Sequence, residues 1–405
     1  MKRGIAMFKR LIASALVASS VASSAMPANA AKDGVTLGFA VAFTGWEAAY
    51  DGEATKMAQL WIEQQNAKGG LLGHPIKQIQ QDTKSDRVEG AKAGQAMVQG
   101  GADVVLVTAD YDYGAPAALQ AQKAGLISVF LGASDPKAGV AGVGKLSFTA
   151  NNAGQVEGAT MAEWGINKRG FKKGYVLVDN LLEYNKSSCA GYEWAFPLHG
   201  GTIVAKDEFK NADASISSQV TRLANAVRDE GVDNVMLCSV TPGGASAIKQ
   251  IRAAGITIPI LSNTGMDGLY WNSAVPDLKD FYVPVQAVFS GDPRAEVEAL
   301  TKAYEAKYGG RPATQYAYPI YAWLDLYAQA VTKVGSTDAE KVVAEMNTYK
   351  DVPTVLGTRS FSDLVHIQTQ IPMFVTEIKD GKQNVIEEVK ISQDIPNDVL
   401  YRLKK

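Results

Sequence analysis

The strongest constraint on this chain is an alternation of strand-like and helix-like segments that runs through its first part and then starts again. After residue 34, the apolar and amphipathic patterns predict helices at 53–66, 87–99 and 116–124, and strands at 35–41, 76–81, 102–107 and 126–131. Strands that alternate with helices form parallel sheets covered by helices on both faces. The first part is therefore predicted to be a doubly wound α/β lobe.

The same alternation returns after Phe148-Thr149-Ala150, although the sequence itself does not repeat. The expected helices are 154–165, 188–197, 216–229 and 244–254, and the expected strands are 174–178, 202–205, 234–238 and 258–261. A chain of 405 residues is long enough for two domains of ordinary size. We predict two doubly wound parallel-sheet lobes, each with its functional edge at the carboxyl ends of its strands.

The last third of the chain does not start a third domain. It is predicted to hold a strand at 280–287, helices at 295–307 and 316–334, and a hairpin of strands 372–379 and 384–391. These segments return to complete the earlier lobes. The expected division is a signal peptide at 1–30, a first lobe at 31–150 and 284–350, and a second lobe at 151–283 and 351–405, which ends in the hairpin.

The first thirty residues have the pattern of a secretory signal peptide. Lys2, Arg3, Lys9 and Arg10 precede a small and apolar stretch at 11–26, and an Ala-x-Ala cleavage site follows at 28–30. Serines interrupt this stretch, which falls short of the roughly 18 uninterrupted apolar residues of a membrane anchor. We expect cleavage near Ala30, a periplasmic location and a mature chain that does not span a membrane.

The charge of the chain argues against one class of partner. The formal net charge is −2, and removal of the four basic residues in the signal peptide takes it to −6. The mature chain therefore lacks the basic footprint of a nucleic-acid-binding protein. We expect no nucleic-acid partner.

The sequence has no motif of a metal enzyme or a serine hydrolase. His74, His199 and His366 stand in separate segments, and no Gly-x-Ser-x-Gly elbow occurs. Residues 139–146 come close to a phosphate-binding loop, but Leu146 stands where a hydroxyl that binds magnesium is required. We expect neither a metal nor a cofactor, although an enzyme that works through carboxylates would need no such motif.

The loops after the predicted strands are the candidate ligand site, because open parallel sheets bind ligands beyond the carboxyl ends of their strands. These loops are 43–50, 109–114 and 132–136 in the first lobe, and 179–184, 239–244 and 263–267 in the second. They concentrate hydroxyls, glycines and aromatic residues with hydrogen-bonding groups, as small-molecule pockets do. The candidate ligand-binding residues in them are Trp46, Tyr50, Tyr111, Asp112, Gly132, Ser134, Tyr184, Thr241, Thr264 and Asp267.

These loops and their surroundings resemble the periplasmic binding proteins of the branched-chain amino acid (Leu/Ile/Val-binding) ABC transporter family, which have the type I solute-binding fold. The resemblance covers nearly all of the chain after residue 30 and is most specific at 43–52, 66–76 and 132–136, with support from 179–184 and 315–318. It implies two lobes joined by a three-crossover hinge, which close over the ligand and dock on an ABC permease.

The resemblance also implies roles for individual residues. Gly132 and Ser134 match the positions that hold the polar head of the ligand, and Tyr50, Tyr184 and Tyr316 match aromatic residues that line the cleft. The residues themselves agree at Ser134, because a hydroxyl at a glycine-containing strand-to-loop junction lies where donors converge on an anion.

Two positions depart from the amino-acid binders of this family. Tyr111, flanked by Asp110 and Asp112, stands where those proteins place a Ser that contacts the ligand carboxylate. Thr264 stands where they place the acid that holds the ammonium group, although Asp267 is close by. We therefore expect either an amino acid bound in an altered way or another ligand, namely an amide, an amine, a polyol or an aromatic acid.

Cys189 and Cys238 both fall in the predicted second lobe and are the two cysteines of the chain. An exported protein meets an oxidising compartment, where such a pair can form a disulfide. Two separate buried thiols are the alternative. The disulfide that the family places in the first lobe is missing.

The leading hypothesis is a monomeric substrate-binding protein that captures its ligand by hinge closure and hands it to the permease of an ABC importer without catalysis. Two alternatives stay open. One is an exported α/β enzyme that acts through carboxylates such as Asp110, Asp112 or Asp267. The other is a ligand-sensing protein that signals to a membrane receptor.

Overall fold

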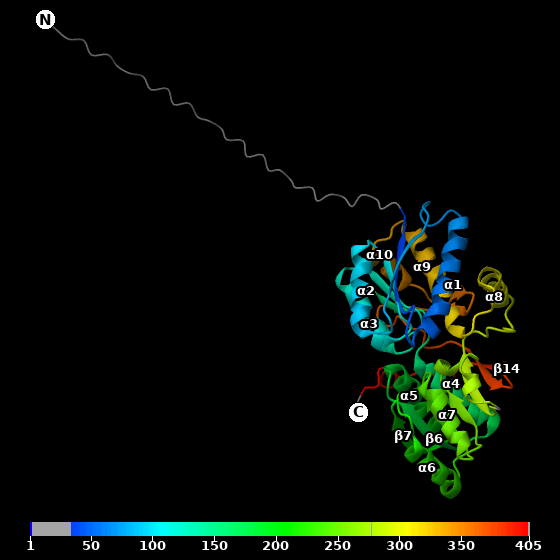
Figure 1. The fold of residues 1–405 in the computed structure, drawn as a ribbon. Helices are drawn as coiled ribbons and strands as arrows, with labels where there is room; N and C mark the ends of the chain where they lie inside the picture. Colours follow the sequence, from blue (N-terminus) through cyan, green and yellow to red (C-terminus); the bar gives the residue numbers. More distant parts are fainter. Residues whose placement is uncertain (2–33, 277, 404–405) are drawn as a thin grey trace. The chain divides into compact units, whose positions relative to one another are not determined.

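Two β-sheets with helices on both faces organise the chain (Figure 1). The structure is a computed structural model that describes residue 1, residues 34–276 and residues 278–403. Apart from Met1, the predicted signal peptide lies outside the described residues. Of the helices in the described part of the chain, none is long and apolar enough to cross a membrane.

The first sheet is built from the first predicted α/β run. Its strands are all parallel and follow the order β2-β1-β3-β4-β5, with bounds β1 Thr36–Val41, β2 Lys77–Asp82, β3 Val104–Val107, β4 Ile127–Phe130 and β5 Ser147–Thr149. Successive residues of a strand point to opposite faces. In β1, Phe39 and Val41 belong to one apolar core and Ala40 to another on the other side of the sheet, so this sheet is buried on both faces.

Helices from two parts of the chain cover the first sheet. The helices that follow its strands are α1 Ala48–Ala67, α2 Arg87–Gln99 and α3 Tyr111–Lys123. Two helices of the last third, α8 Ala295–Tyr308 and α9 Pro319–Val334, pack their apolar residues into the same core as α1. Trp323 and Tyr327 of α9 are examples, and both are buried.

The second sheet combines a parallel part with an antiparallel edge. Its order is β14-β13-β10-β9-β8-β6-β7, with bounds β6 Lys173–Asp179, β7 Thr202–Phe209, β8 Asn234–Cys238, β9 Ile260–Ser262, β10 Phe281–Val285, β13 Met373–Lys379 and β14 Lys382–Val389. Strands β6 to β10 are parallel, whereas β13 and β14 form an antiparallel hairpin at one edge. The predicted C-terminal hairpin is therefore confirmed.

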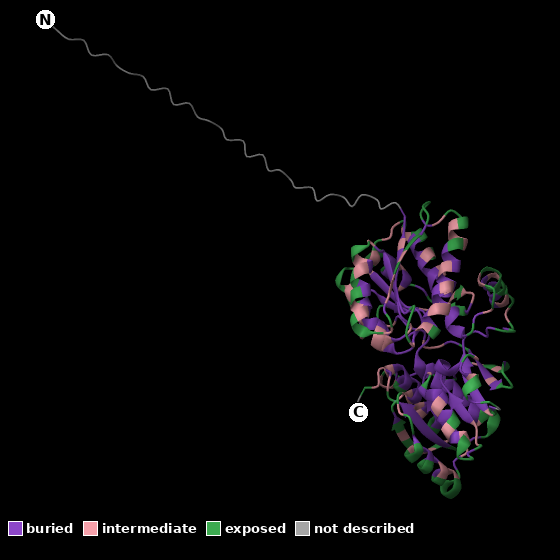
Figure 2. Cartoon of the chain, in the orientation of Figure 1, coloured by how far each residue is buried: buried purple, intermediate pink, exposed green. Residues whose placement is uncertain are grey.

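The helices of the second sheet pack on its two faces. They are α4 Gly154–Arg169, α5 Glu183–Leu198, α6 Ser217–Asn225 and α7 Gly243–Ala253. The apolar residues of α4 and α5 share one core, and those of α6 and α7 share the other. In Figure 2 the central strands are buried, whereas exposed residues lie on the outward turns of the helices and on the edge strands such as β7.

Two glycines bring α4 and α5 into backbone contact. A Cβ atom added at Gly158 would lie 1.9 Å from the carbonyl oxygen of Ser188, and one added at Gly191 would lie 2.1 Å from that of Gln155. Neither position has room for a side chain. This close approach fixes the second and third turns of α5 against α4, and Tyr184 lies in the turn that precedes them.

The chain passes between the two sheets at three places. Ala150, Ala287 and Phe361 pack in the core of the first sheet, while Ala153, Val285 and Ile367 pack in the cores of the second. The short strands β11 Val352–Thr354 and β12 Gly357–Arg359 follow α10 Ala339–Met346 and precede the third passage.

Packing corrects one predicted boundary at the third passage. Leu356 and Phe361 are buried in the core of the first sheet, so the chain returns to the second sheet after them and not at residue 351. The chain ends in α11 Asn397–Leu400. Leu400 packs with α4 and α5 in the second sheet's core.

Polar side chains join the three passages. The Nε2 atom of Gln286 donates to Oδ1 of Asn152 at 2.7 Å and also to Oδ1 of Asn151. Nη2 of Arg359 donates to Oε1 of Gln286 at 2.5 Å. All these residues are buried, so their polar groups cannot bind solvent. Each passage instead finds hydrogen-bond partners for its buried polar groups in the other passages.

A disulfide joins Cys189 of α5 to Cys238 at the end of β8, with 5.8 Å between the two Cα atoms. The structure thus shows the first of the two alternatives that the sequence leaves open. The bond ties α5 to the edge of the second sheet where the candidate loops begin.

Candidate ligand-binding site

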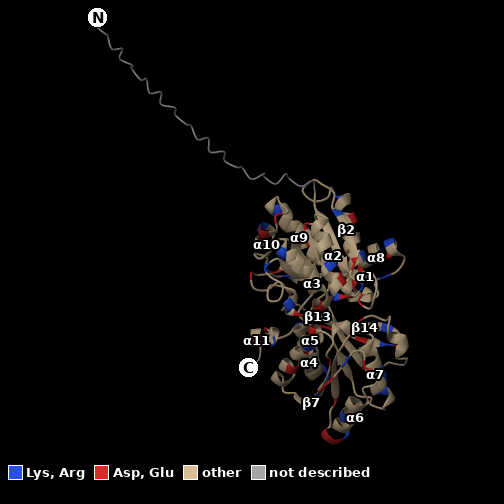
Figure 3. Cartoon of the chain, turned by 60° about the vertical axis from the view of Figure 1, so that its left-hand side comes forward, with Lys and Arg blue, Asp and Glu red and all other residues tan. Residues whose placement is uncertain are grey.

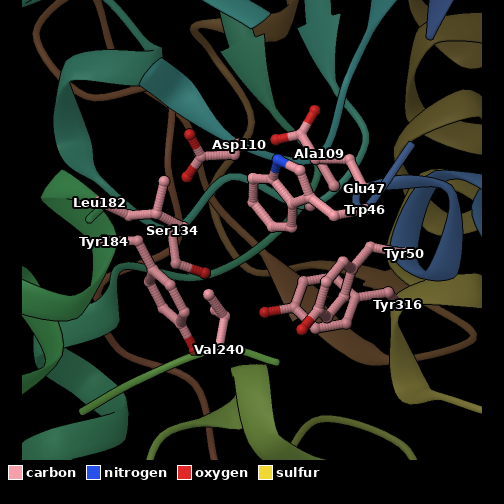
Figure 4. Close-up of a pocket in the computed structure, with 11 residues that line it drawn as sticks. Trp46, Glu47, Tyr50, Ala109, Asp110, Ser134, Leu182, Tyr184, Val240 and Tyr316 are labelled. Carbon is pink, nitrogen blue, oxygen red and sulfur yellow. The ribbon is translucent and has the colours of Figure 1, made fainter. Parts of the chain in front are cut away.

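A cavity lies where loops from the carboxyl ends of both sheets meet (Figure 4). With the loops in this arrangement the cavity has a volume of about 20 Å³, room for about one water molecule, so a larger ligand requires the loops to separate. The residues that line it are Trp46, Glu47, Tyr50, Ala109, Asp110, Gly132, Ser134, Leu182, Tyr184, Val240 and Tyr316. Six of them are among the predicted site residues.

The loop between β1 and α1 supplies the indole of Trp46 and, one helical turn later, the ring of Tyr50. The Trp46 ring meets the rings of Tyr50 and Tyr113 edge to face, with centroids 6.3 and 5.4 Å apart. Tyr50 in turn meets Tyr316 edge to face at 5.3 Å. Such edge-to-face pairs are a favourable arrangement of aromatic rings. They form one connected aromatic wall of the cavity.

Gly132 makes room for the ring of Tyr316. A Cβ atom at position 132 would lie 2.4 Å from Cδ1 of Tyr316, so any side chain there would displace the ring. Tyr316 stands in the single turn Gln315–Ala317 that leads into α9. Gly132 follows β4 by two residues, at the edge where the sequence predicts ligand contacts.

A buried carboxylate behind the cavity orients Tyr184. The hydroxyl of Tyr184 donates to Oε2 of Glu157 at 2.6 Å and accepts from the backbone N–H of Gly265 at 2.8 Å. Glu157 also accepts from the N–H of Thr264 at 3.0 Å. Burial raises the pKa of Glu157 to about 7. The Tyr184 ring therefore has a fixed position at the start of α5.

Two carboxylates, Glu47 and Asp110, reach the cavity from the first sheet. The Thr108 hydroxyl donates to Oε2 of Glu47 at 2.7 Å, whereas Oε1 of Glu47 is buried and has no hydrogen-bond partner among the described residues. Asp110 caps α3 and accepts from the N–H of Asp112 at 2.7 Å. Burial and the neighbouring acids raise the pKa of both carboxyls well above its usual range.

Asp51 lies directly behind these two acids and differs from them in its partners. It accepts from the backbone N–H groups of Ala42 at 2.6 Å and Ala109 at 2.7 Å, and it contacts the hydroxyl of Thr108, whose single proton can go to Asp51 or to Glu47. Burial raises its pKa to about 6. Through these hydrogen bonds Asp51 connects α1 to the ends of β1 and β3.

Hydrogen bonds cross the cavity from the first sheet's loops to the second's. The Tyr50 hydroxyl lies 3.0 Å from Oγ1 of Thr241 and donates to the carbonyl oxygen of Gly265 at 3.1 Å. The N–H of Glu183 donates to Oδ2 of Asp112 at 2.8 Å. The two groups of loops are thus in contact around the cavity.

Ion pairs extend this contact outside the cavity. Lys137 lies 2.6 Å from Glu183, and Arg402 lies 2.5 Å from Glu183 and 3.0 Å from Asp135. Basic and acidic positions stand together near α5 and the C-terminal segment in Figure 3. Asp135 also accepts from the hydroxyl of Ser187 at 2.7 Å.

Five predicted site residues do not line the cavity, and each has another partner. Tyr111 opens α3, with its ring near Phe130, because the cap at Asp110 starts this helix five residues before the predicted start at 116. Asp112 and Thr241 bind groups of the opposite loops, as described above. Thr264 donates its hydroxyl to the carbonyl oxygen of Pro284 at 2.7 Å.

Asp267, the fifth of these residues, supports the cavity indirectly. It is buried and accepts from the Thr314 hydroxyl and the Gln315 N–H, both at 2.6 Å. Burial raises its pKa to about 7. It thereby anchors the turn that carries Tyr316.

The lining residues absent from the predicted set are Glu47, Ala109, Asp110, Leu182 and Val240. All of them fall inside the predicted loops, so their position in these loops was the sequence signal that could have identified them. The choice within each loop depends on where each helix starts, which the sequence patterns placed several residues late for α1, α3 and α5. No group of three or more His, Cys, Asp or Glu in the described part of the chain is placed to hold a metal ion.

Comparison with known proteins assigns the chain to a family. Residues 34–383 match the family described as periplasmic binding protein. The chain belongs to this family. Its two mainly parallel sheets and their connections match the type I fold of the solved substrate-binding proteins LivJ of Streptococcus pneumoniae and LivK of Thermotoga maritima, at TM-scores of 0.76 and 0.77.

Three similar proteins illustrate the relationship. The Leu/Ile/Val-binding protein BraC3 of Rhizobium johnstonii is 24% identical over 88% of this chain and 94% of its own length. The branched-chain amino acid transporter substrate-binding protein LivJ of Streptococcus pneumoniae, solved with isoleucine, has a TM-score of 0.76 and 24% identity over 88% of this chain and 99% of its own. An ABC transporter solute-binding protein of R. palustris, solved with benzoate, has a TM-score of 0.75 and 19% identity over 91% of this chain and 99% of its own.

Proposed function

We propose that this protein captures a small organic solute in the cavity between its two sheets and delivers it to the permease of an ABC importer. The observation that carries the proposal is the lining of the cavity, to which both sheets contribute. Trp46 and Tyr50 come from the first sheet's loops, and Tyr184 and Val240 come from the second's. A ligand that contacts both groups of loops stabilises the arrangement in which they meet.

Family membership supports the same role. Proteins named for Leu, Ile and Val binding align along nearly the full chain, and solved neighbours carry isoleucine or benzoate. The ligand in our proposal is accordingly an amino acid or a related small compound. The ligand-binding residues are Trp46, Tyr50, Gly132, Ser134, Tyr184 and Tyr316, together with Glu47 and Asp110.

The proposed cellular setting follows from this role. The chain acts outside the cytoplasm as a monomer, after cleavage of its signal peptide near Ala30. The two lobes comprise the two sheets with their helices, and the three passages between them form the hinge. The bound solute leaves the protein chemically unchanged.

A thermal-shift screen tests the proposal. The purified mature protein is heated with amino acids, amides, amines, polyols and aromatic acids, because a ligand that binds the native state raises its stability by mass action. We expect a concentration-dependent rise in Tm with at least one class, and recovery of that compound unchanged by NMR. Conversion of the compound would identify an enzyme instead.

A further inference from the structure

The cavity contains acidic groups without a basic partner. Among its lining residues in the described part of the chain are two carboxylic acids, Glu47 and Asp110, and no Lys, Arg or His. Asp51 adds a third buried acid directly behind them. In Figure 4 the two lining carboxyl groups lie at the same end of the cavity, on either side of the Trp46 indole.

The basic residues around the cavity are already paired with other acids. Arg87 lies 3.6 Å from Asp112 and stacks over the ring of Tyr113 at 5.0 Å. Lys137 and Arg402 bind Glu183, at 2.6 and 2.5 Å. Among the described residues, Glu47 and Asp110 form no ion pair of this kind. Asp112 and Glu183 thus have basic partners, whereas Glu47 and Asp110 do not.

Glu47 also lacks a hydrogen-bond donor. Its exposed fraction is 1%, and its Oε1 atom is buried without a partner, although Oε2 is held by Thr108. Buried polar atoms of native proteins are nearly always paired, because an unpaired one costs the full penalty of its desolvation. A group with an N–H that enters the cavity would pair this oxygen.

The walls of the cavity suit a positive charge as well. Trp46, Tyr50, Tyr184 and Tyr316 present ring faces or edges to it. Aromatic faces attract cations through the negative charge of their π-electrons, and Trp does so most strongly. The remaining side chains, Ala109, Leu182 and Val240, offer apolar surface for the rest of a small ligand.

We infer that the cavity selects a protonated amine, whose ammonium group donates to Glu47, lies near Asp110 and packs against Trp46. This inference rests on the proposed function and gives it a ligand class. It separates this protein from its neighbour solved with benzoate, because an anion in this cavity would meet two buried carboxylates without a counter-charge.

Matched ligands of one shape test the inference. The probes are two sets, benzylamine with benzyl alcohol and benzoate, and 3-methylbutylamine with 3-methylbutanol and 3-methylbutanoate, together with leucine. Isothermal titration of the full mature protein measures each affinity. We expect an amine to bind about tenfold or more tightly than its neutral and acidic counterparts, as one charge-assisted hydrogen bond provides.

Two substitutions assign the effect to the named acids. Glu47→Gln keeps the shape and the acceptor and removes the charge, and Asp110→Asn does the same while Asn still caps α3. Each should weaken amine binding by about tenfold or more and change alcohol binding by less than about threefold. Asp229→Asn, an exposed acid paired with Arg228, is the matched control and should change neither. Circular dichroism and Tm establish that each variant is folded.

The outcomes separate the two proposals. If an acid, an alcohol or leucine binds and no amine does, or if amine affinity is the same in wild type, Glu47→Gln and Asp110→Asn, the inference is wrong and solute binding stands. A quaternary ammonium probe, tetramethylammonium, that equals the amines would also overturn it, since that ion has no N–H for Glu47. If no compound of any charge binds, the proposed function itself fails.

Discussion

Gly132 stands at a point of the cavity wall that has no room for a side chain. A single methyl group there would overlap the ring of Tyr316, which is buried and also held by contact with Tyr50. Overpacking of this kind costs about 1–3 kcal/mol in well-packed interiors.

We therefore expect Gly132→Ala to lower the free energy of unfolding by about 1–3 kcal/mol and to weaken ligand binding, because the ring must move into the cavity. Urea denaturation and calorimetric titration measure the two effects. Gly52→Ala, in the second turn of α1 with open space around it, is the control and should be neutral or stabilising. Equal stability and affinity for Gly132→Ala and wild type would show that Tyr316 is not fixed as described.

The acids of the cavity make a prediction about pH. Glu47 faces Asp51 of α1 and Asp110, Asp112 and Tyr113 at the start of α3, and the basic group beside Tyr113, Arg87, pairs with Asp112. Burial, Asp51 and Asp110 raise the pKa of Glu47, so its protonated form persists to higher pH than in water. A protonated amine prefers the ionised form.

Amine affinity should therefore increase with pH between about pH 5 and about pH 8, by up to about tenfold per pH unit while the carboxyl is mostly protonated. The amine itself stays charged over this range, because its pKa is near about 10. Calorimetric titration at a series of pH values measures the slope. A flat profile in wild type, identical to that of Glu47→Gln, would contradict the role of Glu47.

At the scale of single elements, the disulfide between α5 and β8 fixes the helix that carries Tyr184. It links positions 49 residues apart in sequence, and a cross-link across a loop of that length stabilises a protein by about 2–4 kcal/mol in the usual case. Cys189 and Cys238 are both buried, so the bond is shielded from solvent.

We expect the double variant Cys189→Ala/Cys238→Ala to unfold at lower urea concentration than the wild type, with a loss of about 2–4 kcal/mol. The wild type should lose a similar amount once it is reduced, whereas the variant should not respond to reductant. A wild type with two verified free thiols and unchanged stability would contradict this role of the bond.

Most helices and strands could be predicted from the sequence, but the residues at which helices α1, α3 and α5 start could not. Apolar runs such as that of β1 identify strands because parallel strands are buried on both faces. The start of α3 was missed because Pro116 resembles a first-turn residue, whereas Asp110 caps the helix and Pro116 falls inside it. The contact at Tyr111 was predicted from the resemblance to the family, whereas Asp110 lines the cavity in the structure.

The hydrogen-bond partners of buried polar residues could not be predicted from the sequence either. Glu157 and Asp267 each support a cavity tyrosine, but their partners are distant in sequence or in another element. Loop positions after strands could be predicted from topology alone. Which side chain of a loop turns into the cavity depends on packing from both sheets, as at Gly132 and Tyr316.

At the scale of the whole molecule, three chain passages connect the two sheets whose loops form the cavity. The three passages share buried hydrogen bonds around Gln286, and the loops of both sheets meet at Tyr50 and Asp112. A protein that works by closure has to separate these loops when the cavity is empty and bring them together when a ligand contacts both.

The radius of gyration in solution tests this claim most directly. Small-angle X-ray scattering of the mature protein is recorded without ligand and at saturation with the tightest-binding amine of the matched sets. The account predicts a smaller radius with ligand, and a reduced change for Tyr50→Phe, which loses the hydroxyl that reaches Thr241 and Gly265. A radius that stays the same at saturation would contradict capture by closure.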